Sequence, residues 1–448
     1  MRNFDPSPFR ARRERLVQQM QAHGGGVALL ATAPEQMRNR DNDHPYRHDS
    51  HFYYLTGFTE PEALLVLTAA ADGRPRSVLF CRPKDEAREI WDGYRHGPDA
   101  ACAAFGFDAA FALGALDAQL PALLANQPAV FAPLAQPTPA DAPLARALGA
   151  LQAKARSGVR PPPTRHDLLP LLDEMRLVKD GTEIDTMRRA CRIAAAAHAR
   201  AMRVCRPGLR EYHLEAELLH AFRWAGAQAP AYNAIVAAGA NACVLHYRAG
   251  DAELRDGELC LIDAGCELDS YASDITRTFP VNGRFTGPQR AVYALVLAAQ
   301  QAAIEATRPG AAFSAPHDAA VRVLAQGLID LELVEGSVDG AIESGAYRQF
   351  FMHRTSHWLG LDVHDVGDTL EPSAPHTAAG RPPRRLAPGM VMTIEPGLYL
   401  RPAPNVPAAF VHIGVRIEDD VLITAGGCDI LSADAPRQPG EIEALMRG

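Results

Sequence analysis

The hydrophobic pattern changes about one third of the way along the chain. Before residue 155, short apolar runs alternate with helical segments, and after it long helices alternate with pairs of strand-like runs. A basic segment at 10–21 predicts a first helix, and the Ala-, Leu- and Pro-rich stretch 113–153 predicts weakly patterned helices and turns. The apolar runs predict strands at 26–31, 52–56, 63–67 and 77–81. Strands that alternate with helices are typical of an α/β domain.

The clearest interruption of this pattern is the segment 157–164, which contains a glycine and three consecutive prolines. Proline stiffens a chain and ends regular elements, so we expect a linker here. The sequence therefore predicts an N-terminal α/β domain, including this linker, at residues 1–172 and a second domain at residues 173–448.

Two helix pairs are predicted in the second domain. Thr182–Asp185 has the residues of a capping box, and Pro207-Gly208 ends the helix that follows. The next helix is predicted around 214–222. A similar pair is predicted at 289–307 and 318–330, and the tripeptide Arg-Pro-Gly follows the first helix of each pair. One shared tripeptide is weak evidence of internal duplication.

Composition narrows the class of protein. Hydrophobic residues make up 47% of the 448 residues and charged residues 22%, as in globular proteins. No apolar run approaches the roughly 20 residues that span a bilayer, and no signal-peptide pattern follows Met1, so we expect a cytoplasmic protein without a membrane partner. The net charge of −8 argues against a nucleic-acid partner. The eight cysteines form no C-x-x-C pair, which is typical of reduced core cysteines.

The first candidate for chemistry is a pair of aspartates in a predicted hairpin. Asp263 ends an apolar run, and Asp274 lies in the strand after a short turn. With a two-residue turn at Leu268-Asp269, the two aspartates would be direct cross-strand partners, with Cβ atoms about 4.5–5.5 Å apart. Adjacent carboxylates with apolar flanks repel each other unless a cation or a proton lies between them. The alternative is a pair of exposed aspartates, which are common near turns.

Further candidate ligands lie downstream, mostly where apolar runs end or break. They are His353, His357, His364, Glu395 and Glu418, and Arg416 lies on the same face of its strand as Glu418. Each is weak alone, because an H-x-x-x-H pair is mostly incidental and Arg416 with Glu418 also fits an ion pair on an edge strand. Together, two Asp, one His and two Glu form a mostly hard-oxygen donor set. This set favours two divalent cations such as manganese, cobalt or iron, and hydrolytic chemistry, over a structural zinc site.

The segments that carry these residues resemble those of the metallopeptidases with a pita-bread fold, and within them the aminopeptidase P family. They read I-D-A-G-C at 262–266, D-I-T-R-T-F-P at 274–280, H-x-x-S-H-W-L-G-L-D-V-H-D at 353–365, E-P-G-L-Y at 395–399 and R-I-E-D-D at 416–420. Similar segments elsewhere are P-Y-R at 45–47, Y-Y-L-T-G-F at 53–58, W-D-G at 91–93, Y-N at 232–233 and L-H-Y at 245–247. The resemblance covers nearly the whole chain. It implies an α/β N-terminal domain followed by an α+β C-terminal pita-bread domain.

The resemblance also implies roles for individual residues. Asp263 would bind one metal ion, and Asp274 and Glu418 would bridge two. His357 and Glu395 would complete the metal ligands. The implied catalytic residues are Glu395, His353, His364 and His246, and the implied substrate-binding residues are Tyr232, His246, His353, His364, Arg416 and Trp91. Arg416 would also hold the carboxylates in place.

The implied activity is that of a dinuclear metal-dependent aminopeptidase. It would release the N-terminal residue from peptides with proline in the second position, using a hydroxide that bridges two metal ions. Mn2+ is the expected metal, with Co2+, Fe2+ or Zn2+ as other choices. The partners implied are such peptides and further copies of the chain, as a dimer or tetramer.

Three other functions stay open. A prolidase, which cleaves Xaa-Pro dipeptides, has the same five ligands. A methionine aminopeptidase shares the C-terminal fold but normally lacks a large N-terminal domain. A non-catalytic binding protein on this scaffold is the third, although such relatives have usually lost ligands that this chain keeps. The chain departs from the family pattern at Arg354-Thr355, where most relatives have glycine after the first histidine, and this departure bears on substrate range.

Overall fold

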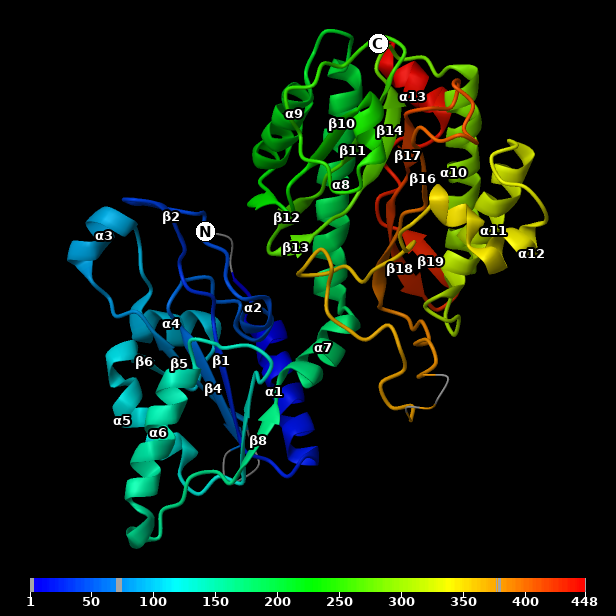
Figure 1. Cartoon of the computed structure of the whole chain (residues 1–448). Helices are drawn as coiled ribbons and strands as arrows, with labels where there is room; N and C mark the ends of the chain where they lie inside the picture. Colours follow the sequence, from blue (N-terminus) through cyan, green and yellow to red (C-terminus); the bar gives the residue numbers. More distant parts are fainter. Residues whose placement is uncertain (1–3, 70–74, 376, 378–379, 448) are drawn as a thin grey trace. The chain divides into compact units, whose positions relative to one another are not determined.

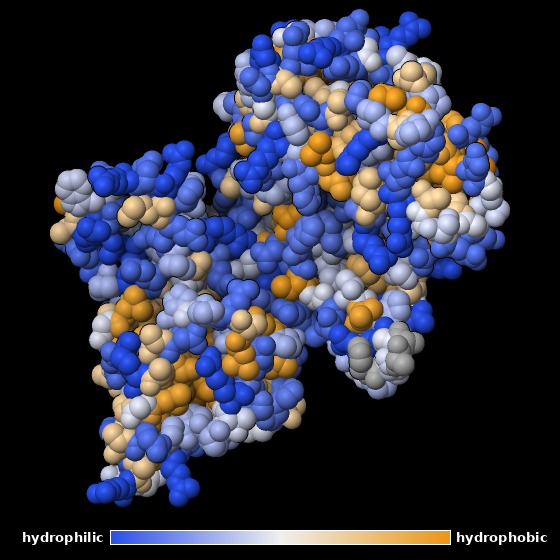
Figure 2. Space-filling view, viewed as in Figure 1, coloured by the Kyte–Doolittle hydropathy of each residue, from blue (hydrophilic) through white to orange (hydrophobic). Residues whose placement is uncertain are grey.

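The chain divides into two compact units, Met1–Met175 and Arg176–Gly448. The structure is a computed structural model that describes residues 4–69, 75–375, 377 and 380–447 (Figure 1). The division lies within helix α7 (Leu169–Leu177), and the predicted boundary at 172/173 lies in the same helix. In the described ranges, no helix combines the length and the apolar character needed to cross a membrane. Polar and charged residues cover much of the visible face of each unit, with apolar residues in separate patches (Figure 2).

Unit 1 is built around a six-stranded mixed sheet of order β6-β5-β4-β1-β7-β8. The strands are β1 (Val27–Ala31), β4 (Leu64–Ala69), β5 (Pro75–Cys81), β6 (Ala109–Ala112), β7 (Ala129–Ala132) and β8 (Thr164–Asp167). Strand β4 runs antiparallel to both of its neighbours, and the other pairs are parallel. Apolar residues of α5 (Leu116–Leu124) and α6 (Asp141–Ala153) pack on alternate strand residues to form the core. Helices α1 (Ser7–Ala22) and α4 (Gly97–Phe105) contact β4 or β5. The other described strands and α-helices before α7 are the hairpin β2 (Met37–Asn39) and β3 (Asn42–Asp43), α2 (Ser50–Thr56) and α3 (Glu86–Asp92).

The first helix and three of the four predicted strands of unit 1 are confirmed, but other predictions are wrong. Residues 52–56 belong to helix α2, because the Asp49 Oδ1 atom accepts a hydrogen bond from the Phe52 N–H at 2.8 Å and so caps the helix. The proline-rich segment 157–164 is not a linker between the units. Its last residue begins β8, which pairs with β7, so the segment is mostly a loop inside unit 1. Strand β7 itself lies in the stretch predicted to hold only helices and turns.

Unit 2 contains the two predicted helix pairs. The first pair is α8 (Gly181–Val204) with α9 (Glu211–Trp224), and the second is α10 (Gly287–Ala306) with α11 (Ala315–Asp330). The capping box of α8 lies two residues before the predicted start, because the Asp180 side chain accepts from the Glu183 N–H while Glu183 accepts from the Asp180 N–H. After α7, the other described α-helices of this unit are two shorter ones, α12 (Val338–Ser344) and α13 (Pro439–Met446).

Each helix pair is followed by a long antiparallel hairpin that is interrupted midway. In the first hairpin, β11 (Leu259–Asp263) and β12 (Cys266–Leu268) pair with β14 (Thr276–Pro280) and β13 (Tyr271–Ala272). In the second, β15 (Val391–Ile394) and β16 (Gly397–Leu400) pair with β18 (Asp419–Thr424) and β17 (Ile413–Arg416). The register is the same on both sides of each interruption. Strands β9 (Ala229–Pro230), β10 (Ile235–Ala238) and β19 (Gly427–Ile430) extend these sheets.

The predicted register of the first hairpin is wrong. The two turn residues are Asp269 and Ser270, with φ of 46° and 72°, as a type I′ turn requires. Asp263 therefore pairs with Thr276 and not with Asp274. Because the register differs from the prediction by two residues, the alternation of faces is preserved. The two aspartates therefore still lie on the same side of the hairpin.

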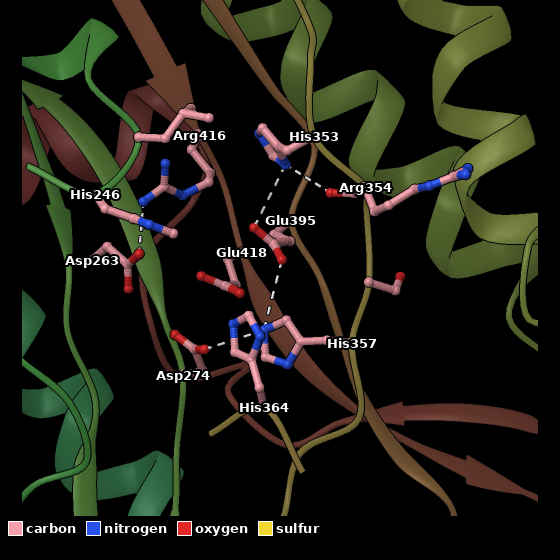
Figure 3. A pocket seen from close by; sticks show the side chains of 12 residues that line it. His246, Asp263, Asp274, His353, Arg354, His357, His364, Glu395, Arg416 and Glu418 are labelled. Carbon is pink, nitrogen blue, oxygen red and sulfur yellow. Dashed lines mark hydrogen bonds and ion pairs between the residues drawn. The ribbon is translucent and has the colours of Figure 1, made fainter. Parts of the chain in front are cut away.

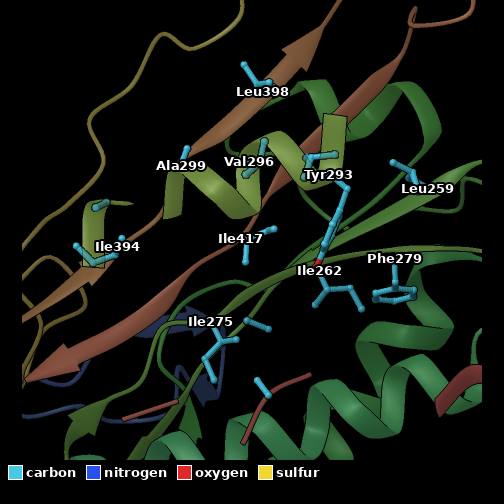
Figure 4. Packing of buried hydrophobic residues seen from close by; sticks show 14 of the residues in the cluster. Leu259, Ile262, Ile275, Phe279, Tyr293, Val296, Ala299, Ile394, Leu398 and Ile417 are labelled. Atoms are coloured by element: carbon cyan, nitrogen blue, oxygen red, sulfur yellow. The ribbon is translucent and has the colours of Figure 1, made fainter. Parts of the chain in front are cut away.

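The core of unit 2 lies directly beside the interruptions. Ile262, Ile394 and Ile417 are buried with Val296 and Ala299 of α10 in one cluster (Figure 4). Each of these isoleucines immediately precedes a carboxylate residue in the sequence. Because successive side chains of an extended chain point to opposite sides, the carboxylates face away from the core.

Candidate metal centre

Four carboxylates come from the interruptions of the two hairpins. Asp263 ends β11, Asp274 lies between β13 and β14, Glu395 between β15 and β16, and Glu418 between β17 and β18. The Glu418 N–H donates to the Thr276 C=O at 3.1 Å, which joins the two hairpins at this point. The four side chains therefore face one cavity of about 430 Å³ (Figure 3). The cavity is also lined by Leu245, His246, His353, Arg354, Ser356, His357, His364 and Arg416.

The interruption beside Asp263 requires a glycine. A Cβ atom on Gly265 would lie 1.6 Å from the Ser273 carbonyl oxygen, so no other residue fits without moving the backbone. The Asp274 N–H is turned to the Asp420 Oδ2 atom, 3.0 Å away, instead of bonding across the hairpin. The side chain of Asp274 is thereby held beside that of Asp263.

His357 is held so that one ring nitrogen faces the carboxylates. Its loop runs along β15, where the Thr393 N–H donates to the His357 C=O at 3.0 Å. Its Nδ1 donates to the Trp358 C=O at 2.9 Å, because a carbonyl only accepts. Its Nε2 lies 3.5 Å from Asp274 Oδ2 and 3.7 Å from Glu395 Oε1. Ligand atoms of Asp274, His357 and Glu418 all lie within 4.8 Å of one another.

The charges of this cluster favour a bound cation. Burial, together with the neighbouring carboxylates, raises the pKa of Glu395 to about 7, and it raises the pKa of Asp274 and Glu418 as well. Burial alone would lower the pKa of His357, but its hydrogen bond to Asp274 and the negative charges around it raise that pKa to about 9. The side chains thus take up protons when no other positive charge compensates them. Four oxygen donors and one imidazole fit divalent metal ions.

Arg416 lies at the edge of the carboxylate cluster. Its Nη2 donates to Asp263 Oδ2 at 2.6 Å, and its Nε donates to Thr276 Oγ1 at 3.2 Å. The Thr276 hydroxyl in turn donates to Glu418 Oε2 at 2.6 Å. Arg416 therefore orients Asp263 directly and Glu418 through Thr276.

The Tyr232 hydroxyl contacts both Asp263 and Asp274. Its hydroxyl oxygen is 2.5 Å from both Asp263 Oδ1 and Asp274 Oδ1, so its one hydrogen is donated to one of them at a time. Burial and these carboxylates raise the pKa of Tyr232 well above its usual value.

The three predicted histidines lie around the same cavity. His353 donates from Nδ1 to the Arg354 C=O at 2.7 Å, and its Nε2 lies 2.8 Å from the Tyr399 hydroxyl. Burial and the charge of Arg416 lower the pKa of His353 to about 4. The ring of His364 stacks on that of His357, with centroids 4.0 Å apart.

Two further residues singled out in the sequence have exposed side chains. The Arg354 side chain points away from the carboxylates (Figure 3). Trp91 belongs to unit 1, where it lies on helix α3 with 82% of its surface exposed.

Comparison with known proteins identifies the family. The profile of metallopeptidase family M24 matches residues 185–425, and that of the aminopeptidase P N-terminal domain matches residues 9–131. The chain belongs to metallopeptidase family M24. It is 46% identical to the Xaa-Pro aminopeptidase of Escherichia coli K12 over 446 residues, which cover 100% of this chain and 99% of that protein.

Solved structures agree with this M24 assignment over the full length. The aminopeptidase PepP of Pseudomonas aeruginosa matches with a TM-score of 0.95 and 48% identity, covering 100% of this chain and 99% of that one. A zinc-substituted E. coli aminopeptidase P in complex with product matches with a TM-score of 0.93 and 45% identity, covering 99% of each chain. The expected aminopeptidase P family, its two-domain fold and the metallopeptidase class are thereby confirmed.

Three residues that support this M24 site are not predicted from the sequence. Tyr399 contacts both His353 and Arg416, and Thr276 connects Arg416 with Glu418. Thr276 and Tyr399 both lie inside the motif segments, and this position could have marked them as residues of the site. Asp420, whose carboxylate accepts the Asp274 N–H, lies in the R-I-E-D-D segment and is fully buried.

Proposed function

We propose that this M24 metallopeptidase is a dinuclear aminopeptidase that releases the N-terminal residue from peptides with proline in the second position. The main support is the convergence of five ligand side chains and three histidines on one cavity. The substrate class is supported by the relatives that carry the name Xaa-Pro aminopeptidase.

The proposed metal ligands are Asp263, Asp274, His357, Glu395 and Glu418, and the proposed ions are two Mn2+. When bound, such ions supply a hydroxide nucleophile at neutral pH and stabilise negative charge on the substrate oxygen. The donor set supports this choice because it contains no thiolate and four carboxylates.

The other residues of the cavity position the peptide and move protons. Glu395 takes the proton of the attacking water and passes it to the leaving nitrogen, with His353 close by, since its Nδ1 lies 3.9 Å from Glu395 Oε2. His246 and His364 donate hydrogen bonds to the carbonyl oxygen as it gains charge. Arg416 and Tyr232 hold the aspartates, and Trp91 is proposed to contact the substrate from an N-terminal unit.

A proline in the second position explains why a dedicated enzyme is needed. The nitrogen of the scissile bond lies in the pyrrolidine ring and carries no hydrogen. A peptidase that must accept a hydrogen bond from that N–H therefore loses this contact. The cluster of carboxylates and histidines proposed here needs only to protonate the nitrogen as it leaves.

The test is hydrolysis by the manganese-loaded protein of an Xaa-Pro-Xaa tripeptide and of the matching Xaa-Pro dipeptide, with chelator-treated protein as the control. We expect faster cleavage of the tripeptide, with release of its first residue. Cleavage of the dipeptide alone would instead identify a prolidase. If metal is bound and neither peptide is cleaved, the proposed substrate class is wrong, and the fold assignment is unaffected.

We also propose that the protein self-associates and works in the cytoplasm. Self-association is supported by helix α3, whose described residues include none that is buried. A reducing compartment is supported by the eight cysteines, all of which are free thiols.

A further inference from the structure

The loop that carries His246, residues 239–250, is held by a residue outside the cavity. His246 is exposed and lines the cavity, and its ring has no hydrogen-bond partner among the residues that the structure describes. The position of this ring therefore depends on the loop backbone. The Arg401 guanidinium donates to the Cys243 C=O at 2.7 Å and fixes the loop at one point. The Tyr212 N–H donates to the Gly250 C=O at 3.2 Å, and four further hydrogen bonds from the loop and the residue before it are accepted by Glu211.

Glu211 is the first residue of α9, and none of its surface is exposed. Its Oε1 accepts from the Ala238 N–H and from Asn241 Nδ2, both at 2.9 Å. Its Oε2 accepts from the Tyr247 hydroxyl at 2.8 Å and from the Gly250 N–H at 3.0 Å. One buried carboxylate thus joins the residue before the loop, the end of the loop and two side chains within it, one of them next to His246.

This arrangement requires a carboxylate. Each oxygen accepts two hydrogen bonds, which is the full capacity of an ionised carboxylate oxygen. Hydrogen bonds to a charged acceptor are stronger than neutral ones, and buried donors that lose such a partner are costly. A glutamine has nearly the same shape, but its amide group would place two donors against two of the four donors of the loop.

We infer that Glu211 is a positioning residue for the reaction: it holds the 239–250 loop so that His246 faces the cavity. The inference rests on the proposed function, in which His246 contacts the substrate. Glu211 itself does not line the cavity. Three of its four donors lie within the loop, and the fourth lies at the end of β10, directly before it. Its effect on the reaction is therefore transmitted through the loop.

The first experiment is a double-mutant cycle with His246. Glu211→Gln is expected to lower kcat/KM for the Xaa-Pro-Xaa tripeptide about tenfold to a hundredfold, because small misplacements of a contacting group have effects of that size. In a His246→Ala background the same substitution should change kcat/KM less than about twofold, because coupled residues are non-additive. The matched control is Glu217→Gln on the same helix, whose carboxylate pairs with Arg200 at the surface.

The second experiment measures hydrogen exchange of the loop and does not depend on activity. Glu211→Gln should speed exchange at the amides of Ala238 and Gly250, which donate to this carboxylate, and Glu217→Gln should leave them unchanged. If Glu211→Gln does not fold, Tyr247→Phe, which removes a single donor, replaces it in both experiments.

Equal losses of kcat/KM in both backgrounds would overturn the inference, because Glu211 would then act independently of His246. Unchanged exchange at both amides would also overturn it, as would faster exchange with wild-type kcat/KM. If the wild-type protein cleaves no Xaa-Pro peptide, the proposed function fails first and the inference fails with it. The exchange measurement then shows separately whether Glu211 holds the loop.

Discussion

Glu395 lies between two imidazoles at the centre of the cavity. Its Oε1 is 3.7 Å from His357 Nε2, and its Oε2 is 3.9 Å from His353 Nδ1. Glu395→Gln keeps the shape of the side chain and removes its charge and its capacity to accept a proton. We expect kcat for the tripeptide to fall about 10²- to 10⁴-fold. Glu343→Gln, at an exposed position of α12, is the control. Near wild-type turnover with metal bound would contradict the role of Glu395.

Metal binding should release protons, because His357 must lose its proton to become a metal ligand. Because its pKa is raised to about 9, this imidazole is protonated at pH 7 when no metal is bound. A metal ligand must be a neutral imidazole, so binding displaces that proton, and the apparent affinity should fall as the pH falls below about 9. Calorimetric titration with Mn2+ in two buffers of different ionisation enthalpy measures the protons released. We expect about one proton or more per chain, and a buffer-independent heat would contradict His357 as a ligand.

At the scale of single residues, the motifs predict which side chains gather but not how they are supported. The Thr276 hydroxyl links Glu418 to Arg416 by hydrogen bonds, and the Asp274 N–H donates to the Asp420 carboxylate. These contacts join residues about 140 positions apart in the sequence, and no local pattern reports them. Glu211 is missed for the same reason. It is the first residue of a helix, where a surface glutamate is equally common, so the sequence does not mark it as buried.

Among the elements, the first hairpin combines a successful prediction with a wrong one. The alternation of apolar and polar residues predicts both strands and the common face of the two aspartates. The register depends on the two turn residues with positive φ, Asp269 and Ser270. Neither is a glycine or an asparagine, the residues that usually mark such a turn, and the assumed turn at Leu268-Asp269 also contains neither, so the sequence does not distinguish the two registers.

The interruption at Gly265 leads to a prediction about the same hairpin. In Gly265→Ala the new Cβ would lie 1.6 Å from the Ser273 carbonyl oxygen, so the two strands must separate beside Asp263. We expect a loss of about 3 kcal/mol or more in the free energy of unfolding, and weaker Mn2+ binding. Denaturant unfolding and metal titration measure the two effects. Gly287→Ala, where nothing lies within 4 Å of the added Cβ, is the control and should be close to neutral.

For the whole molecule, the sequence predicts two domains that meet at 172/173, but it wrongly interprets the proline-rich segment 157–164 as a linker. A run of prolines is a reasonable signal for a linker, yet here it forms most of a loop that returns the chain to the sheet of unit 1 as β8. The real division lies inside α7, a continuous helix with no proline–glycine signal at that point. The predicted boundary at 172/173 lies in the same helix, three residues before this division.

Helix α3 leads to the last prediction, which concerns assembly. It has seven residues, and a helix this short is unstable in water without tertiary packing. Its ends are fixed by polar contacts, such as that from the Arg88 N–H to Asp85 Oδ1, but Ile90 and Trp91 are each 82% exposed. Apolar side chains gathered on such a helix mark an interaction surface. We expect sedimentation to give a mass of at least twice 48.3 kDa, the mass of one chain. Ile90→Asp should shift this mass toward that of a single chain. Glu86→Gln on the same helix should leave the mass unchanged. A single-chain mass for the wild-type protein at all concentrations would contradict the proposed self-association without affecting the metal centre, whose ligands all lie in unit 2.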